Sequence, residues 1–151
     1  ANVPLFEMNA AKQAYMGLDL KRWATHWNID FNFPKDFPLR TPTPLRVALI
    51  KPRTTSFLYH AAWVEGHNIG DPDLLIQLLN QGGWSGQDLV SQTQDPKVKD
   101  QLKINTHEAI QAGAFGVPSF VIRRPNQLDQ LFWGQDRIPF LVQALNTNGP
   151  I

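Results

Sequence analysis

Two short stretches in the last third of the sequence carry groups that suit a peptide-like ligand. The first is Val117-Pro118, at the start of an apolar run that ends at Ile122. An X-Pro bond is the kind of peptide bond that adopts the cis form at modest cost. Proline also lacks a ladder donor, so it belongs at a strand start or an edge. We therefore predict a cis Val117–Pro118 bond that turns the backbone N–H and C=O of Val117 outward, ready to pair with an extended peptide.

The second stretch is Gly134-Gln135-Asp136, which follows a short apolar run and opens a final helix. Unpaired N–H groups and the helix dipole favour an anion at such a helix start. Asp136 is predicted to be the N-cap of this helix, which should cover about residues 137–145. Both stretches also have a purely structural interpretation: a turn before a strand for Val117-Pro118, and an ordinary cap for Asp136.

Composition excludes several classes of protein. The chain has 151 residues, 42% hydrophobic and 18% charged, with a net charge of +1. These values suit one soluble domain and indicate neither a nucleic-acid nor a membrane partner. Residues 1–20 lack the order of a secretory signal. Cysteine is absent, so no disulfide or Cys-x-x-Cys redox pair can form within these residues. The four histidines lack metal-ligand spacing, so we predict no metal.

Proline and capping signals predict that residues 9–112 are helical throughout, with an extended aromatic loop around residues 30–39. The predicted helices are 9–27, with Asn9 as a possible N-cap; 43–51, with the start signal Thr43-Pro44; 55–64; 73–81, after the start signal Asp71-Pro72; a short one after Ser85; and 97–112. Two strands follow, 117–122 and 130–133, joined as a hairpin. Because an isolated hairpin is marginally stable, either another chain completes the sheet or the sequence lacks the beginning of its own domain.

Short motifs follow one another in a fixed order over nearly the whole chain. They are Asn2, Lys12, Tyr15-Met16, Asp19-Leu20, Phe33-Pro34-Lys35-Asp36-Phe37, Trp63 before Gly66, the stretches 96–103 and 113–118, and Leu131-Phe132-Trp133-Gly134-Gln135-Asp136-Arg137. In this order they resemble the kappa class of glutathione transferases. That class shares its fold with the 2-hydroxychromene-2-carboxylate isomerases and with disulfide oxidoreductases of the DsbA type.

This resemblance implies an α/β fold: a thioredoxin-like, DsbA-like domain with a large inserted helical domain. Residues 1–8 would be a loop at the end of the N-terminal thioredoxin half, residues 9–112 the inserted helical domain, and residues 113–151 the C-terminal half. The first strand–helix–strand of the family, which would precede Asn2, is expected to be missing from this sequence. The family's active-site serine, or the cysteine pair of the oxidoreductases, lies in that segment. The catalytic residue is therefore unknown.

The resemblance also implies that the ligand is glutathione, acting as a co-substrate. Its cysteinyl backbone would pair with Val117 before Pro118, and its γ-glutamyl carboxylate would lie at the helix start by Gln135. Asp136 would bind the γ-glutamyl ammonium group.

Two further residues match family positions at the other end of the tripeptide. Lys12 would bind the glycyl carboxylate, and Asn2 would lie near the thiol and the glycyl end. Without the family match, Lys12 is a solvated surface charge.

The first functional hypothesis is a kappa-type glutathione transferase, which adds the glutathione thiolate to a small apolar electrophile in a detoxification reaction. Phe6 and the loop 31–37 are candidate contacts for the electrophile. The alternatives are a glutathione-dependent 2-hydroxychromene-2-carboxylate isomerase, a DsbA-like oxidoreductase, and, from another class, a non-catalytic peptide-binding module if the chain truly begins at Ala1. By the resemblance we expect a homodimer, located in mitochondria or peroxisomes if eukaryotic and in the cytoplasm if bacterial.

Overall fold

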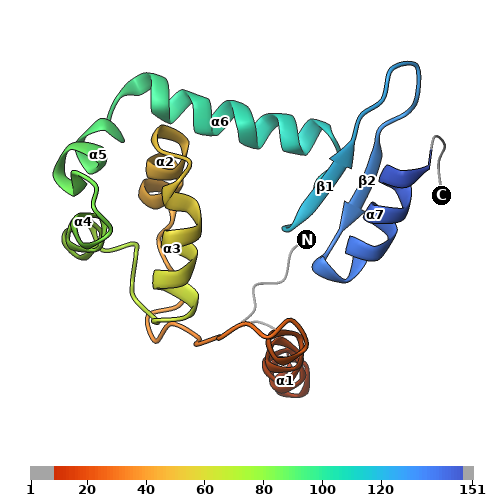
Figure 1. Ribbon diagram of the computed structural model, residues 1–151, viewed down its shortest axis with the longest axis horizontal. Coiled ribbons are helices and arrows are strands. Elements are labelled where there is room, and N and C mark those ends of the chain that lie inside the picture. The colour runs from red at the N-terminus through yellow and green to blue at the C-terminus, as the bar shows by residue number, and fades with distance from the viewer. Residues whose placement is uncertain (1–8, 148–151) are drawn as a thin grey trace. The chain divides into compact units, whose positions relative to one another are not determined.

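The computed structural model describes residues 9–147 (Figure 1). The chain forms two compact units, residues 1–95 and residues 96–151. Within residues 9–147, none of the helices combines the length and apolar character needed to cross a lipid bilayer.

The first unit is built from helices. They are α1 (Ala10–His26), α2 (Pro42–Ile50), α3 (Thr54–Trp63), α4 (Pro72–Gln81) and α5 (Gly86–Gln92). Its core comes from one apolar face of each of α2 to α5, and its most completely buried members are Val47, Leu75 and Leu79. Helix α1 has no buried residue.

Two predicted helix starts in this unit are confirmed by their caps. The Asn9 side chain accepts a 2.8 Å hydrogen bond from the N–H of Lys12, and Asp71 accepts from the N–H groups of residues 73 and 74. The predicted start of α2 at Thr43-Pro44 is wrong, because the helix begins two residues earlier. Thr41-Pro42 presents the same signal, with proline in the first turn, where its missing N–H costs nothing.

The predicted aromatic loop packs onto the end of α3. The rings of Phe31 and Trp63 stack with centroids 6.1 Å apart, and Phe33 and Phe37 both contact Trp63 edge-on or tilted. The N–H of Asn32 donates to the carbonyl of Trp63 at 2.6 Å. The Phe37–Pro38 bond is cis, which the sequence did not lead us to expect.

The second unit holds the described strands. Helix α6 (Pro96–Gln111) leads to β1 (Ser119–Ile122), which pairs antiparallel with β2 (Gln130–Trp133). A 3₁₀ turn, η2 (Gln135–Arg137), and helix α7 (Ile138–Asn146) follow. The prediction that β1 starts at residue 117 is wrong by two residues, because Pro118 has no N–H to donate and regular pairing begins only at Ser119.

Strand register fixes which side chains share a face of this small sheet. Ser119 lies opposite Trp133, and Val121 lies opposite Leu131, so these four residues share one face. Ile122, on the other face, is buried. Helix α7 contacts β2, and its Ala144 is also buried. In Figure 1, α7 runs alongside the hairpin.

Candidate functional site

The approach to the first predicted site is a tight turn after α6. Gly113 has a φ of +85°, a conformation that favours glycine, and the N–H of Ala114 donates back to the carbonyl of Ala109. The Ser119 hydroxyl donates to the carbonyl of Gly116 at 2.6 Å, which closes the turn over Val117 and Pro118.

The predicted cis bond between Val117 and Pro118 is confirmed. The Val117 side chain is 91% exposed. In the described part of the chain, no group is hydrogen-bonded to the backbone N–H or C=O of Val117. Both groups are therefore available to an extended ligand.

The second predicted site differs from the expectation in how Asp136 is used. Asp136 caps neither η2 nor α7; the residues at the two cap positions are Gly134 and Arg137, and neither makes a side-chain capping bond. The prediction that Asp136 is the N-cap is wrong because the chain first makes a 3₁₀ turn, in which the N–H of Arg137 donates to the carbonyl of Gly134 at 3.2 Å. The Asp136 carboxylate instead pairs through Oδ2 with Nη1 of Arg137.

The same turn leaves backbone donors without partners. Gly134 has a φ of +100° and directs the chain out of β2. Within residues 9–147, neither the N–H of Gln135 nor that of Asp136 donates a hydrogen bond. Two adjacent donors at a turn are a suitable partner for one carboxylate.

The structure brings these two stretches together. The carbonyl of Pro118 accepts a 2.9 Å hydrogen bond from the N–H of Gly134, immediately beyond the last ladder pair, Ser119 with Trp133. Four predicted residues, Val117, Pro118, Gln135 and Asp136, therefore lie at one end of the hairpin.

The other two predicted residues are not part of this group. Lys12 lies on α1 in the unit of residues 1–95, where it is exposed, so its role stays a prediction. Asn2, like the candidate electrophile contact Phe6, lies outside the described residues.

An aromatic pair next to the site was missed from the sequence. The rings of Phe115 and Trp133 have centroids 5.0 Å apart and are tilted by 50°. They line a shallow pocket of about 360 Å³ together with Leu131, Phe132 and Arg137. The available signal was positional, because each aromatic residue lies two positions before a predicted ligand-binding residue.

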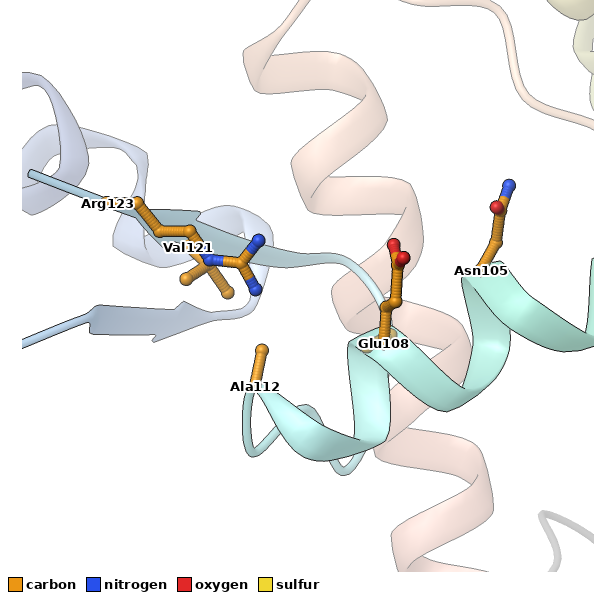
Figure 2. A pocket seen from close by; sticks show the side chains of 6 residues that line it. Asn105, Glu108, Ala112, Val121 and Arg123 are labelled. Atoms are coloured by element: carbon orange, nitrogen blue, oxygen red, sulfur yellow. The ribbon is translucent and has the colours of Figure 1, made fainter.

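A second pocket, of about 290 Å³, lies between α6 and β1 (Figure 2). Asn105 and Glu108 project from α6, and Arg123 extends from the end of β1. It contains none of the predicted site residues. Its one cation is already engaged, since Arg123 pairs with Asp129 at 3.0 Å.

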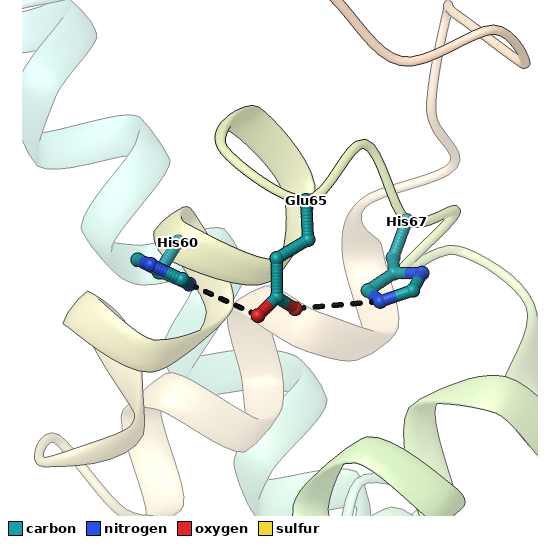
Figure 3. A network of polar contacts seen from close by, with 3 residues as sticks. All are labelled: His60, Glu65 and His67. Atoms are coloured by element: carbon teal, nitrogen blue, oxygen red, sulfur yellow. Dashed lines mark ion pairs between the residues drawn. The ribbon is translucent and has the colours of Figure 1, made fainter. Parts of the chain in front are cut away.

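A polar network lies at the end of α3 (Figure 3). One carboxylate oxygen of Glu65 lies 3.5 Å from Nδ1 of His60, and the other lies 3.3 Å from Nε2 of His67. All three side chains are more than 40% exposed. Among residues 9–147, no group of three or more histidine, cysteine or acidic side chains has the geometry to hold a metal ion.

Comparison with known families and proteins gives consistent results. The family model described as a DSBA-like thioredoxin domain matches residues 1–146. Glutathione S-transferase kappa 1 of Homo sapiens is 31% identical over 93% of this chain and 70% of its own length. The 2-hydroxychromene-2-carboxylate isomerase of Sphingobium xenophagum is 27% identical, over 86% of this chain and 66% of its own length. Glutathione S-transferase kappa 2 of Caenorhabditis elegans is 29% identical, over 89% of this chain and 66% of its own length. The chain thus spans about two thirds of the length of these relatives.

This chain also superposes on a solved structure of a 2-hydroxychromene-2-carboxylate isomerase, with a TM-score of 0.78 at 22% sequence identity. The superposition covers 97% of this chain and 71% of the isomerase chain. Together with the family match, this similarity confirms the predicted thioredoxin-like, DsbA-like fold with helical insertion and the resemblance inferred from the motifs.

Proposed function

Because the chain belongs to the family of DSBA-like thioredoxin domains, with relatives named glutathione S-transferase kappa, we propose that it binds glutathione as a co-substrate at the end of the hairpin formed by β1 and β2. The main observation behind this proposal is the hydrogen bond between Pro118 and Gly134. It holds the unpaired backbone groups of Val117 next to the unpaired N–H groups of residues 135 and 136.

The central, cysteinyl part of glutathione has the backbone of an extended peptide. Its N–H and C=O groups pair with the unpaired C=O and N–H of Val117, as when a peptide adds to the edge of a sheet. The high exposure of Val117 supports this pairing, because nothing in the described part of the chain covers the segment.

The γ-glutamyl group carries a carboxylate and an ammonium. The carboxylate accepts from the N–H groups of Gln135 and Asp136, both without partners in the described residues. The ammonium pairs with the Asp136 carboxylate, whose Oδ2 is already held by Arg137, so that Oδ1 is the oxygen available to it. At the other end of the tripeptide, Lys12 and Asn2 are the proposed contacts of the glycyl end.

The reaction we propose is addition of the glutathione thiolate to an apolar electrophile. The thiolate, rather than the thiol, is the nucleophile, so the site must favour the ionised sulfur. No described residue is assigned that role. A second candidate reaction is cis–trans isomerisation with glutathione as co-substrate, which is favoured by the 27% identity to a 2-hydroxychromene-2-carboxylate isomerase. The oxidoreductase and the non-catalytic peptide-binding module remain alternatives.

The test is made on the protein as its gene encodes it. Calorimetric titration with glutathione measures binding, and conversion of 1-chloro-2,4-dinitrobenzene, followed by absorbance, measures transfer. Binding with conjugation supports a transferase, and binding with turnover of 2-hydroxychromene-2-carboxylate alone supports the isomerase. Binding without either reaction supports a non-catalytic module. Reduction of a disulfide substrate supports the oxidoreductase. Absence of binding at millimolar glutathione contradicts the proposal.

A further inference from the structure

We propose that Ser119 is a positioning residue of the glutathione site. Its hydroxyl fixes the direction of the Val117 N–H, the donor that pairs with the cysteinyl carbonyl of the ligand. The inference rests on the proposed function and adds to it a residue outside the proposed ligand contacts. Its evidence lies entirely in the unit of residues 96–151.

The hydroxyl of Ser119 holds a backbone carbonyl three residues earlier. Ser119 is partly buried, and its Oγ donates to the carbonyl oxygen of Gly116 at 2.6 Å, a normal length for a bond of this type. No other group in the described part of the chain donates to this carbonyl. The orientation of the Gly116 carbonyl therefore depends on the serine hydroxyl.

That carbonyl and the N–H of Val117 belong to the same peptide unit. Among residues 9–147, the bonds in the cis form are those before Pro38 and Pro118, so the bond between Gly116 and Val117 is trans. A trans peptide unit is planar, and its C=O and N–H point in opposite directions. Because the C=O of Gly116 points toward Ser119, the N–H of Val117 points away from it, where no described group accepts it.

Ser119 is itself held in place by the strand ladder. It is the first residue of β1 and lies opposite Trp133 of β2. The carbonyl just before it, that of Pro118, accepts the 2.9 Å hydrogen bond from Gly134. The backbone that carries the hydroxyl is therefore anchored on the residue next to Val117 and Pro118.

Gly116 is confined from a second direction. A Cβ added at Gly116 would lie only 2.6 Å from Nε1 of Trp133, so the indole approaches the backbone closely. Glycine permits this approach, but it is also the residue with the greatest backbone freedom. Without the hydroxyl of Ser119, the peptide unit after Gly116 is free to rotate, and the Val117 N–H rotates with it.

This arrangement prepares the backbone donor before the ligand arrives. A ligand that meets an N–H already pointing outward does not have to order it, and less of the interaction energy is lost on binding. The hydroxyl has a single hydrogen, which the Gly116 carbonyl accepts, so Ser119 is not available as a donor to the glutathione sulfur. Its role is exerted through Val117.

The first measurement is calorimetric titration of the gene-encoded protein with glutathione. Ser119→Ala should weaken binding about fivefold, the scale of one intramolecular hydrogen bond. Ser119→Thr retains a hydroxyl and should bind within about twofold of the original protein. Thr106→Ala is the matched control, because the Thr106 hydroxyl donates to the carbonyl of Leu102 at 2.8 Å within α6, away from the site. It should leave the affinity unchanged.

The second measurement separates positioning from a general loss of structure. Hydrogen exchange of single amides is followed by NMR in protein saturated with glutathione, which should slow exchange at Val117, Gln135 and Asp136. In Ser119→Ala at saturation, the Val117 amide should exchange about fivefold faster than in the original protein. The amides of Gln135 and Asp136 should keep their rates, because the hydroxyl does not hold their peptide units.

Three results overturn the inference. They are an unchanged Val117 amide in Ser119→Ala, an equal acceleration of all three amides, and a loss of affinity in Ser119→Thr as large as that in Ser119→Ala. Failure of the proposed function is recognised separately, in the original protein. If that protein does not bind glutathione, or binds it without protecting the Val117 amide, the proposed backbone pairing fails, and this inference fails with it.

Discussion

The carbonyl oxygen of Pro118 accepts a 2.9 Å hydrogen bond from the backbone N–H of Gly134, across the end of a hairpin only four residues long in each strand. A fully extended tripeptide spans about 10 Å, at roughly 3.3–3.6 Å a residue. One small peptide is therefore long enough to reach the backbone of Val117 and the donors of Gln135 together.

Gly134→Ala should destabilise the protein and weaken glutathione binding. The φ of +100° is unfavourable for any residue with a side chain, and the new Cβ would lie 2.5 Å from Oδ1 of Asp136. We expect a loss of about 1–3 kcal/mol in the free energy of unfolding, measured by urea denaturation. Gly17→Ala in α1 is the control, because its Cβ would meet no atom within 4 Å. It should stabilise the protein by about 0.5–1 kcal/mol. Equal effects from the two substitutions would refute the strain argument.

Asp136→Asn should weaken glutathione binding by roughly 1.5–3 kcal/mol, the scale of a hydrogen bond to a charged group. The substitution keeps the size of the side chain and removes the charge that, in the proposed site, pairs with the γ-glutamyl ammonium. Asp129→Asn is a close control, because both carboxylates pair with an arginine and are exposed to a similar extent. The exposed fraction of the side chain is 43% for Asp136 and 46% for Asp129. Calorimetry that gives the same affinity for both variants would remove Asp136 from the site.

Val117→Ala should leave glutathione affinity within about twofold of the original value. The proposed contacts use the main chain, and the side chain is almost fully exposed, so its truncation removes no buried surface. A tenfold loss measured by calorimetry would show that the side chain, not the backbone, makes the contact.

The cap residues of α4 and α2, Asp71 and Thr41, offer a test of stability that does not depend on the proposed function. Asp71→Ala should lower the free energy of unfolding by about 1 kcal/mol, because the carboxylate accepts from the N–H groups of Asp73 and Leu74. Thr41→Ala should change it by less than about 0.5 kcal/mol, since Thr41 holds the cap position of α2 without a side-chain hydrogen bond. Chemical denaturation of both variants measures the difference, and a larger loss for Thr41→Ala would contradict it.

Local sequence rules predicted the parts of this fold that depend on a few neighbouring residues. The cis bond before Pro118, the caps at Asn9 and Asp71, and the hairpin all follow from proline geometry, side-chain acceptors or strand pattern. The predictions were least accurate where two local signals compete. Thr41-Pro42 and Thr43-Pro44 carry the same start signal, and only the packed helix distinguishes between them.

Other features could not be predicted from local start signals or strand patterns. The pairing of Asp136 with Arg137 replaces the predicted cap because a 3₁₀ turn precedes α7. The contact of Phe115 with Trp133 requires the strand register and the absence of a side chain at Gly116, neither of which a local pattern contains. The roles of Lys12 and Asn2 came from the family resemblance and stay predictions.

The pairing of Ser119 with Trp133 has a consequence for how this hairpin tolerates changes in length. Extra residues in the connection between Ile122 and Gln130 would lengthen a surface loop and leave the ladder in place. A single residue inserted within β2 would turn the indole to the opposite side of the sheet and move Gly134 out of reach of Pro118. Insertions in the connection should therefore accumulate freely among homologous sequences, whereas the spacing from Leu131 to Asp136 should remain fixed.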